Sequence, residues 1–449
     1  MQGKCLPCYF IIYIYGIKSN SDCSNMAKNN RFAFVLVTSL FFFWGFVHNL
    51  DPVLIPHLRR AFSLTTFEAS LVDFSIFIAY FLMAIPAGLI VKKYGYKVGI
   101  LTGLCFFALG CFLFIPAANT MQYIFFLGAL FVVACGLATL ETVANPYATM
   151  LGAPETATQR LNFAQSFNGL AAFFAPIIGG YLILSDNPKT DAEVAAMAPE
   201  IRHTYLLSET ASVKMPYLIL GCVILVVAFI FLLSKLPEKK TDKEETESRG
   251  FFHALRHKQL SWAVAAQFFY VGAQVCILSF LILYAEKVSG IPEKEGKYYS
   301  GIAGLLFMIG RFAGTFFMQY VQPPKLLKLY AIICTILCGV LILGSGKVTI
   351  YAMLGISFFM SIMFPTIFAL GIDGLGADTK AGSSLLVMSV AGGALVPLLL
   401  GLIADKTGDF RLGYIVPLIC FAVVFLFAWT GYKRRGVEEV EVKINFSAH

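Results

Sequence analysis

Charged side chains are scarce in this sequence. Asp, Glu, Lys and Arg make up 13% of its 449 residues, whereas hydrophobic residues make up 58%. A water-soluble protein of this length needs more polar side chains to cover its surface, so the composition excludes that class and indicates a polytopic membrane protein. The net charge of +8 is concentrated in short segments between apolar runs. We therefore assign it to membrane topology and expect no nucleic-acid partner.

The sequence also lacks the motifs of enzymes and metal sites. Its polar segments contain no nucleophile triad, no phosphate-binding loop and no cluster of metal ligands, and its six His residues are scattered. Most of the eleven Cys residues fall singly inside apolar runs, which is typical of buried, reduced thiols. We expect no metal, no cofactor and no enzymatic activity. A membrane-embedded enzyme is the alternative from a different class.

Long apolar runs, by contrast, recur along the chain. About twelve of them, each of roughly 20 residues, are long enough to cross a bilayer. Backbone groups in lipid must be hydrogen-bonded within their own segment, so each run predicts a transmembrane α-helix. The sequence therefore predicts an all-α membrane protein with spans at 32–54, 69–91, 98–117, 123–151, 161–184, 216–233, 262–285, 300–320, 326–343, 348–370, 383–404 and 414–429.

A charged segment between the sixth and seventh runs divides the chain into two halves. It lacks long apolar stretches and predicts a solvated linker that is too short to hold an ATPase. Met26, which precedes the basic residues ahead of the first helix, is an alternative start. We expect an N-terminal extension (1–31), a six-helix bundle (32–234), the linker (235–261), a second six-helix bundle (262–432) and a tail (433–449).

Lys and Arg residues lie mainly on one side of the predicted membrane. The short loop 118–120 on the other side is uncharged, and Arg59 and Arg60 are the exceptions there. The bias predicts that the linker and both termini are cytoplasmic. It rests on Lys92, Lys93, Lys97, Lys325, Lys328, Lys433, Arg434 and Arg435.

The two halves repeat a pattern of Gly and Pro at nearly constant spacing. Such a pattern is expected of two duplicated, pseudo-symmetric bundles, and it predicts a binding site between them near the middle of the membrane. The matching pairs are Gly45 with Gly272, Gly88 with Gly314, Pro146 with Pro365 and Pro176 with Pro397.

A carboxyl group follows an uncharged apolar run at Glu141. An ionised side chain at such a position is costly, so it predicts a function. Burial favours its protonated form, which suits a proton carrier. The alternative is a structural carboxyl group bonded to a partner helix.

Three amides share one face of the next run. Asn162, Gln165 and Asn168 are spaced three residues apart. Amides both donate and accept hydrogen bonds, which suits the recognition of hydroxyl groups. Polar contacts that hold helices together are the alternative.

These motifs resemble the major facilitator superfamily and, within it, the L-fucose:proton symporter family. The resemblance extends from Arg31 to Tyr432. It rests on Phe41-Phe42-Phe43-Trp44-Gly45, His48-Asn49-Leu50-Asp51, Leu140-Glu141-Thr142, Ala144-Asn145-Pro146, Arg160-Leu161-Asn162, Tyr270-Val271-Gly272-Ala273-Gln274, Gly310-Arg311-Phe312 and Phe364-Pro365-Thr366.

The resemblance implies proton-coupled import of a monosaccharide by alternating access, with L-fucose favoured. Glucose, galactose or an N-acetylhexosamine are alternatives within the family, and drug efflux is a third. The family uses a carboxyl group on the first helix and another on the fourth. Glu141 matches the fourth-helix position, whereas Asp51 lies one residue early and is followed by Pro52. We assign proton coupling to Glu141 and Asp51.

Further binding residues are expected on other helices. Asn49 and Gln274 come from the first helix of each half, and we expect both to join Asn162, Gln165 and Asn168 at the sugar. Arg311 lies inside an apolar run and needs an anionic or substrate partner there, or else it holds a loop at the cytoplasmic end. We expect a monomer in the inner membrane of a bacterium, with the lipid bilayer, a sugar and a proton as its partners.

Overall fold

The computed structural model describes residues 21–50, 62, 66–120, 122–183, 196–237 and 251–432. Asp51 lies outside them, as do residues 1–20, the central part of the charged segment and the tail from residue 433.

Helices long enough to cross a bilayer dominate the fold. The described residues contain eleven stretches that are long and apolar enough to do so. One of them, Phe74–Thr120, belongs to α4 (Thr66–Thr120), which is two helices joined at Gly95. The φ angle of 87° at Gly95 is one that residues with a Cβ rarely adopt. Counting the two parts of α4 separately gives twelve spans, and the predicted all-α membrane protein is confirmed.

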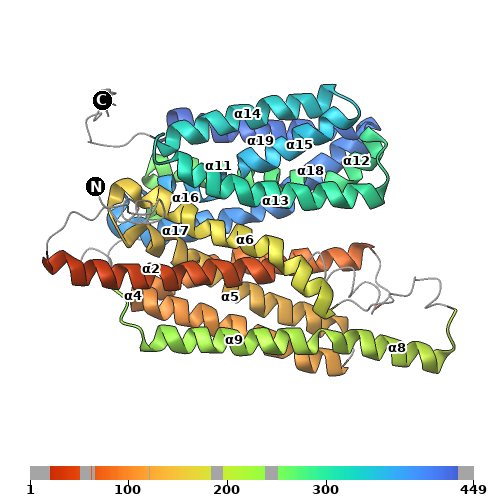
Figure 1. Ribbon diagram of the computed structural model, residues 1–449, viewed down its shortest axis with the longest axis horizontal. Helices are drawn as coiled ribbons and strands as arrows, with labels where there is room; N and C mark the ends of the chain where they lie inside the picture. The colour runs from red at the N-terminus through yellow and green to blue at the C-terminus, as the bar shows by residue number, and fades with distance from the viewer. Residues whose placement is uncertain are drawn as a thin grey trace, which may run out of the picture.

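The first half of the chain forms one bundle, coloured red to green in Figure 1. In the view of Figure 1, α8 continues the line of α9 beyond the rest of the bundle. Besides α4, its helices are α2 (Ser21–His48), α5 (Tyr123–Met150), α6 (Ala157–Ile183), α8 (Pro199–Ser212) and α9 (Lys214–Leu233).

The second half forms the other bundle, in which several spans are interrupted. The breaks lie between α11 and α12, between α15 and α16, and between α17 and α18. The helices are α11 (Lys258–Ser279), α12 (Leu281–Ser289), α13 (Glu293–Phe317), α14 (Pro323–Leu343), α15 (Lys347–Met360), α16 (Met363–Ile372), α17 (Thr379–Met388), α18 (Gly392–Thr407) and α19 (Ile415–Leu426).

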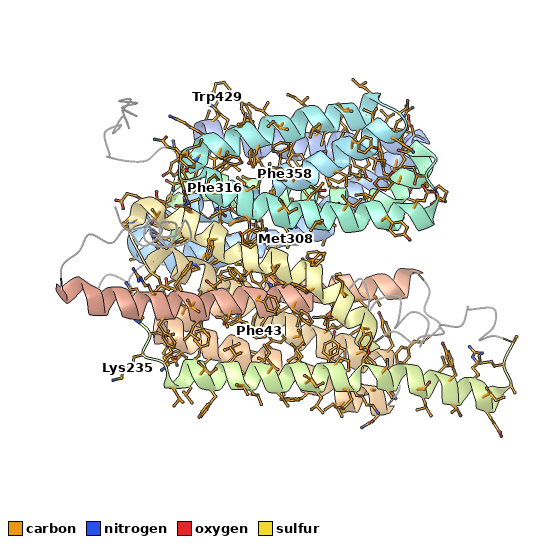
Figure 2. The ribbon with its side chains drawn as sticks, viewed as in Figure 1. Phe43, Lys235, Met308, Phe316, Phe358 and Trp429 are labelled. Carbon is orange, nitrogen blue, oxygen red and sulfur yellow. The ribbon has the colours of Figure 1, made fainter. Side chains whose placement is uncertain are left out.

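The outer surfaces of the two bundles carry exposed apolar side chains. Trp429 projects from the second bundle in Figure 2, and Leu233 and Leu343 are exposed in the same way. An apolar surface of this kind is stable in contact with lipid tails, in agreement with the multi-pass membrane assignment.

The two bundles pack against each other through a small set of helices. From the first half, α6 lies against α13 and α16, while α4 and α5 lie against α17. We call the end of the molecule where α9 ends and α11 begins the linker end. It lies on the left in Figure 1. The contacts between halves that are described below extend from this end toward the middle of the helices.

The linker end is fastened by polar contacts within each half. In the second half, Asp378 Oδ2 lies 3.0 Å from His257 Nε2 and 3.4 Å from His253 Nδ1. In the first half, Lys97 Nζ donates to the carbonyl oxygen of Leu232 at 2.7 Å, at the end of α9. A cation at the C-terminus of a helix complements its unpaired carbonyl groups.

Glycines bring α4 and α5 into close contact. A Cβ at Gly136 would lie 2.5 Å from the backbone nitrogen of Phe107, and a Cβ at Gly110 would lie 2.4 Å from that of Val133. Small residues at such positions let two membrane helices approach closely, where packing rather than the hydrophobic effect stabilises their association.

We expect Gly136→Ala to destabilise the first bundle. The added methyl group meets backbone atoms of α4, which cannot move without separating the helices, so a loss of about 1–3 kcal/mol is expected. Gly128→Ala on the same helix is the matched control, because no heavy atom lies within 4 Å of its Cβ position. The apparent melting temperatures of the two detergent-purified variants are compared. Equal values would contradict the close packing of α5 on α4 at Gly136.

Candidate functional site between the two halves

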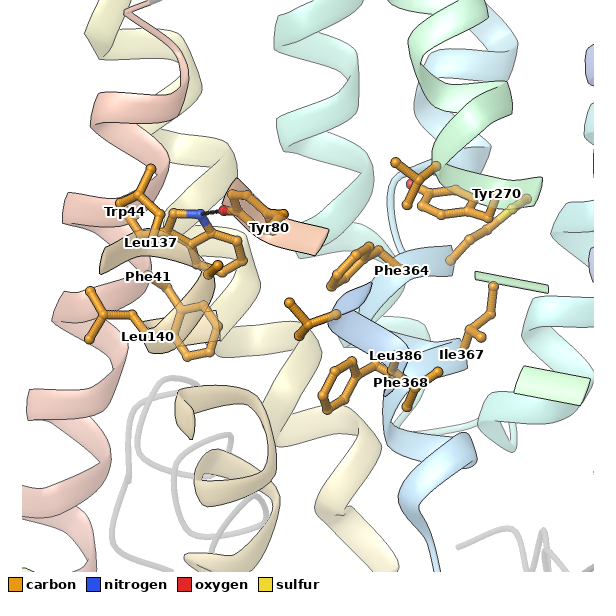
Figure 3. Packing of buried hydrophobic residues seen from close by; sticks show 14 of the residues in the cluster. Phe41, Trp44, Tyr80, Leu137, Leu140, Tyr270, Phe364, Ile367, Phe368 and Leu386 are labelled. Carbon is orange, nitrogen blue, oxygen red and sulfur yellow. Dashed lines mark hydrogen bonds between the residues drawn. The ribbon is translucent and has the colours of Figure 1, made fainter. Parts of the chain in front are cut away.

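Glu141 is buried in α5, where this helix faces the second half. Its side chain is only 2% exposed and forms a hydrogen bond with Tyr80 of α4. The Tyr80 hydroxyl in turn accepts a hydrogen bond from Trp44 Nε1 at 3.0 Å (Figure 3). Within the described part of the chain, Glu141 Oε1 has no hydrogen-bond partner. One carboxyl oxygen is therefore anchored, and the other is available to a proton or a ligand.

The amides of α6 face the other helices of the interface. Gln165 Nε2 donates to Asn145 Oδ1 of α5 at 3.0 Å. Asn162 Nδ2 donates at 3.1 Å to Thr366 Oγ1 of α16, which belongs to the second half. Asn168 Oδ1 lies 3.3 Å from Nη1 of an arginine in α13. The face predicted from the spacing of these amides thus meets both α5 and the second half.

That arginine, Arg311, is a buried cation held by both halves. Its side chain is 5% exposed, and its Nη1 donates to the carbonyl oxygen of Gln165 at 2.6 Å. Its Nε donates to the carbonyl oxygen of Ser361 at 3.1 Å, and its guanidinium group lies 4.7 Å from the centre of the Phe307 ring. Glu141 is near enough to attract this charge.

Prolines supply two of the carbonyl oxygens that the interface uses. A proline has no backbone N–H, so the carbonyl group four residues earlier in the helix loses its donor. Pro146 frees the carbonyl of Thr142, which accepts from Ser383 Oγ of the second half at 2.6 Å. Pro365, the matching residue of the second half, lies four residues after Ser361, whose carbonyl accepts from Arg311.

Two further contacts join the halves nearer the linker end. Gln159 Nε2 of α6 donates to the carbonyl oxygen of Thr315 in α13 at 3.2 Å. The ammonium group of Lys380 lies 5.5 Å from the centre of the Tyr96 ring, a cation–π distance. Together with the Ser383 hydrogen bond, these contacts hold the two bundles together between the site and the linker end.

The predicted site residues fall into two groups. Asn162, Gln165 and Asn168 lie at the contact with the second half, and the last two meet Arg311 directly. Asn49 Nδ2 instead donates to the carbonyl oxygen of Gly45 in its own helix at 2.7 Å, and Gln274 is half-buried in α11. Among the described residues, no hydrogen bond links Asn49 or Gln274 to the Arg311 group.

Tyr80 and Asn145 were missed by the sequence-based selection of site residues. Both contact selected residues, since Tyr80 bonds to Glu141 and Asn145 bonds to Gln165. Asn145 offered a signal, because it is a polar residue one helical turn after Glu141. Tyr80 offered little, since tyrosines are numerous in this sequence.

Buried polar atoms without partners gather at this interface. Glu141 Oε1, Asn145 Nδ2 and Asn162 Oδ1 are all buried, and none has a hydrogen-bond partner among the described residues. Each such atom costs about 1–3 kcal/mol if it stays unpaired. Water or a polar ligand with donors and acceptors would satisfy these three atoms.

Two membrane bundles with a buried carboxyl group, a cation and amides between them define the class of secondary transporters. Comparison with known proteins agrees with this class. The family model of the Major Facilitator Superfamily matches residues 33–385. The chain therefore belongs to the Major Facilitator Superfamily, and it is a transporter rather than an enzyme.

Its relatives narrow the family further. The chain is 42% identical over 402 residues to the L-fucose-proton symporter of Escherichia coli strain K12, covering 88% of this chain and 92% of that protein. It is 40% identical over 408 residues to the glucose/galactose transporter of Brucella abortus strain 2308, covering 90% and 95%. A crystal structure of the transporter FucP in the outward conformation matches with a TM-score of 0.84 and 41% identity, over 89% of this chain and 99% of that one. The protein is a sugar transporter of the FucP family.

We expect Ser383→Ala to loosen the contact between the halves. The substitution removes the only side-chain donor described for the Thr142 carbonyl, which costs about 1–3 kcal/mol when that group is left buried and unpaired. Ser384→Ala is the matched control, because Ser384 Oγ donates within its own helix, to Lys380. Backbone hydrogen exchange in α5 and α17 should rise for the first variant and not for the second. Equal exchange in the two variants would contradict a clamping role for Ser383.

Proposed function

We propose that this protein imports a monosaccharide together with protons across a bacterial inner membrane by alternating access, and that L-fucose is its first candidate substrate. The observation that carries the proposal is Glu141, a buried carboxyl group with one unpartnered oxygen at the contact between the two bundles. Ionisable residues in such positions are typical of proton-coupled transport.

The charge on Glu141 gives a physical route from the proton to the movement. Ionised Glu141 in the first half attracts Arg311 in the second half, which helps to hold the bundles together. Protonation removes that attraction and lowers the cost of separating them at the linker end. A bound sugar completes the change only if it stabilises one arrangement more than the other. Sugar and proton thus favour the switch together.

The sugar's hydroxyl groups match the hydrogen-bonding groups of the interface. We assign their recognition to Asn162, Gln165, Asn168 and Arg311, whose side chains together present donors and acceptors at the contact between the halves. Asn49 and Gln274 belong to the same proposal, as residues that approach the sugar in another stage of the cycle. Asp51 is proposed as the second proton-coupling residue.

The orientation follows from the Lys and Arg bias of the sequence. We place the linker end and both termini on the cytoplasmic side. The contacts of Ser383, Gln159 and Lys380 all join the halves toward that end. In the proposed orientation, this arrangement has its cytoplasmic side closed. Because both walls of the site come from one chain, we propose a monomer as the working unit.

Substrate identity is tested by uptake into proteoliposomes under an inward pH gradient. We expect the proteoliposomes to accumulate radiolabelled L-fucose, and unlabelled L-fucose to inhibit this uptake. D-glucose, D-galactose and N-acetylglucosamine are tested as competitors for the same uptake. The second candidate is glucose/galactose transport, which the name of the Brucella relative favours. Gradient-driven uptake of radiolabelled D-galactose and D-glucose, together with no uptake of L-fucose, would replace fucose by that pair. Uptake that persists unchanged after the gradient collapses would contradict symport.

We expect Glu141→Gln to separate exchange from accumulation. The amide is neutral, like the protonated carboxyl group, so sugar exchange between the two sides of the membrane continues. It cannot release a proton, so accumulation driven by a pH gradient falls to the background level. Counterflow and gradient-driven uptake in the same proteoliposomes measure the two activities.

The matched control is Glu286→Gln, which changes an exposed carboxyl group in α12 and should leave both activities intact. A Glu141→Gln protein that still concentrates sugar would remove Glu141 from the coupling mechanism. The same pair of assays on Asp51→Asn tests the second proposed acid.

A further inference from the structure

Asn145 lies at the centre of the hydrogen-bonded groups between the halves. Its side chain is fully buried in α5, and its Oδ1 accepts from Gln165 Nε2 at 3.0 Å. Gln165 Oε1 in turn lies 3.4 Å from Arg311 Nη1. The three side chains form a chain of contacts from the second half into α5.

This chain fixes which way the Asn145 amide faces. A guanidinium group can only donate, so the Gln165 atom beside Arg311 must be its oxygen. The Gln165 nitrogen therefore donates, and the Asn145 atom that it contacts must also be an oxygen. The NH₂ group of Asn145 is then directed away from Gln165, and this orientation follows from the hydrogen-bonding chemistry of the chain of contacts.

The NH₂ group of Asn145 has no acceptor in the described part of the chain, and Glu141 Oε1 has no partner there either. The two residues are four positions apart on one helix, so they share a face, with Cβ atoms about 6 Å apart. A buried donor and a buried acceptor thus lie one helical turn from each other without being bonded. An oxygen that both accepts and donates can satisfy the pair, and a hydroxyl group does this.

We propose that Asn145 is a specificity-determining residue that, together with Glu141, holds one hydroxyl group of the bound sugar. The sugar oxygen accepts from Asn145 Nδ2, and its hydrogen is shared with Glu141 Oε1. The inference rests on the proposed sugar transport and adds a contact to it. Arg311 then acts on specificity indirectly, since it orients Gln165 and Gln165 orients Asn145.

The test is a binding experiment with the purified full-length protein in nanodiscs. The probes are L-fucose and its 2-deoxy, 3-deoxy and 4-deoxy analogues. Asn145→Leu, which keeps the size of the side chain and removes its polar atoms, should weaken L-fucose binding about 10- to 100-fold. One deoxy analogue should bind the wild type more weakly than L-fucose does, by a similar factor. The substitution should not weaken the binding of that analogue any further. The other analogues should lose affinity on substitution as L-fucose does.

Thr139→Val is the matched control, because Thr139 is buried in the same helix and its hydroxyl donates to the Cys135 carbonyl at 2.7 Å. Thr139→Val should leave the affinities for L-fucose and its analogues unchanged. Asn145→Ala removes the same donor and supplies the test if the leucine variant does not fold. If all four sugars lose affinity equally, the 1-deoxy analogue is measured too, because the anomeric hydroxyl group is the one that the series leaves in place. An equal loss for that analogue as well, or no loss for any sugar, would overturn the proposal, because neither result pairs Asn145 with one hydroxyl group.

Binding without a gradient keeps this inference separate from the proposed function. If the wild type binds L-fucose but no analogue shows the selective pattern, only the role of Asn145 fails. If the wild type binds none of the four sugars, the same series is measured with D-galactose and its deoxy analogues. Failure of both series contradicts the proposed function itself.

Discussion

A proline within a membrane helix leaves a carbonyl group without its donor, and no water is present in the lipid to replace it. The contact between the two halves is built on this constraint. Pro146 frees the carbonyl of Thr142, and Ser383 binds it from the opposite bundle. Pro365 occupies the matching place in the second half, where Arg311 binds the freed carbonyl of Ser361. Each proline thus provides an acceptor that a side chain can engage and release.

Arg311 joins these acceptors to the polar groups of the site. It is buried, so its donors must be satisfied, and it finds acceptors in α6 of one half and at the break between α15 and α16 of the other. No carboxylate is described within hydrogen-bonding distance of it. Glu141 attracts this charge at longer range only when it is ionised, and its ionisation depends on a proton. The stability of the contact and the state of the proposed proton carrier are therefore linked.

Much of the fold was predictable, because transmembrane spans are a local property. A run of about 20 apolar residues has one stable backbone conformation in lipid, whatever surrounds it. Each predicted span overlaps an observed helix or pair of helices. Pro146 and Pro365 each lie four residues after a carbonyl group that a side chain of the second half binds. The predicted spans 69–91 and 98–117 lie on either side of Gly95, whose backbone angle separates the two parts of α4.

The site was predictable only in part, and the reason is again physical. The sequence by itself determined that Glu141 is a carboxyl group in an apolar run, that Pro146 follows it in the same run, and that three amides of α6 share a face. These conclusions need only the geometry of one helix. Tertiary structure alone decided which partners they meet: Ser383 lies 241 positions from Thr142, and Arg311 lies 146 positions from Gln165. Helical periodicity relates residues within a few turns, whereas these pairs are set by the packing of one bundle on the other.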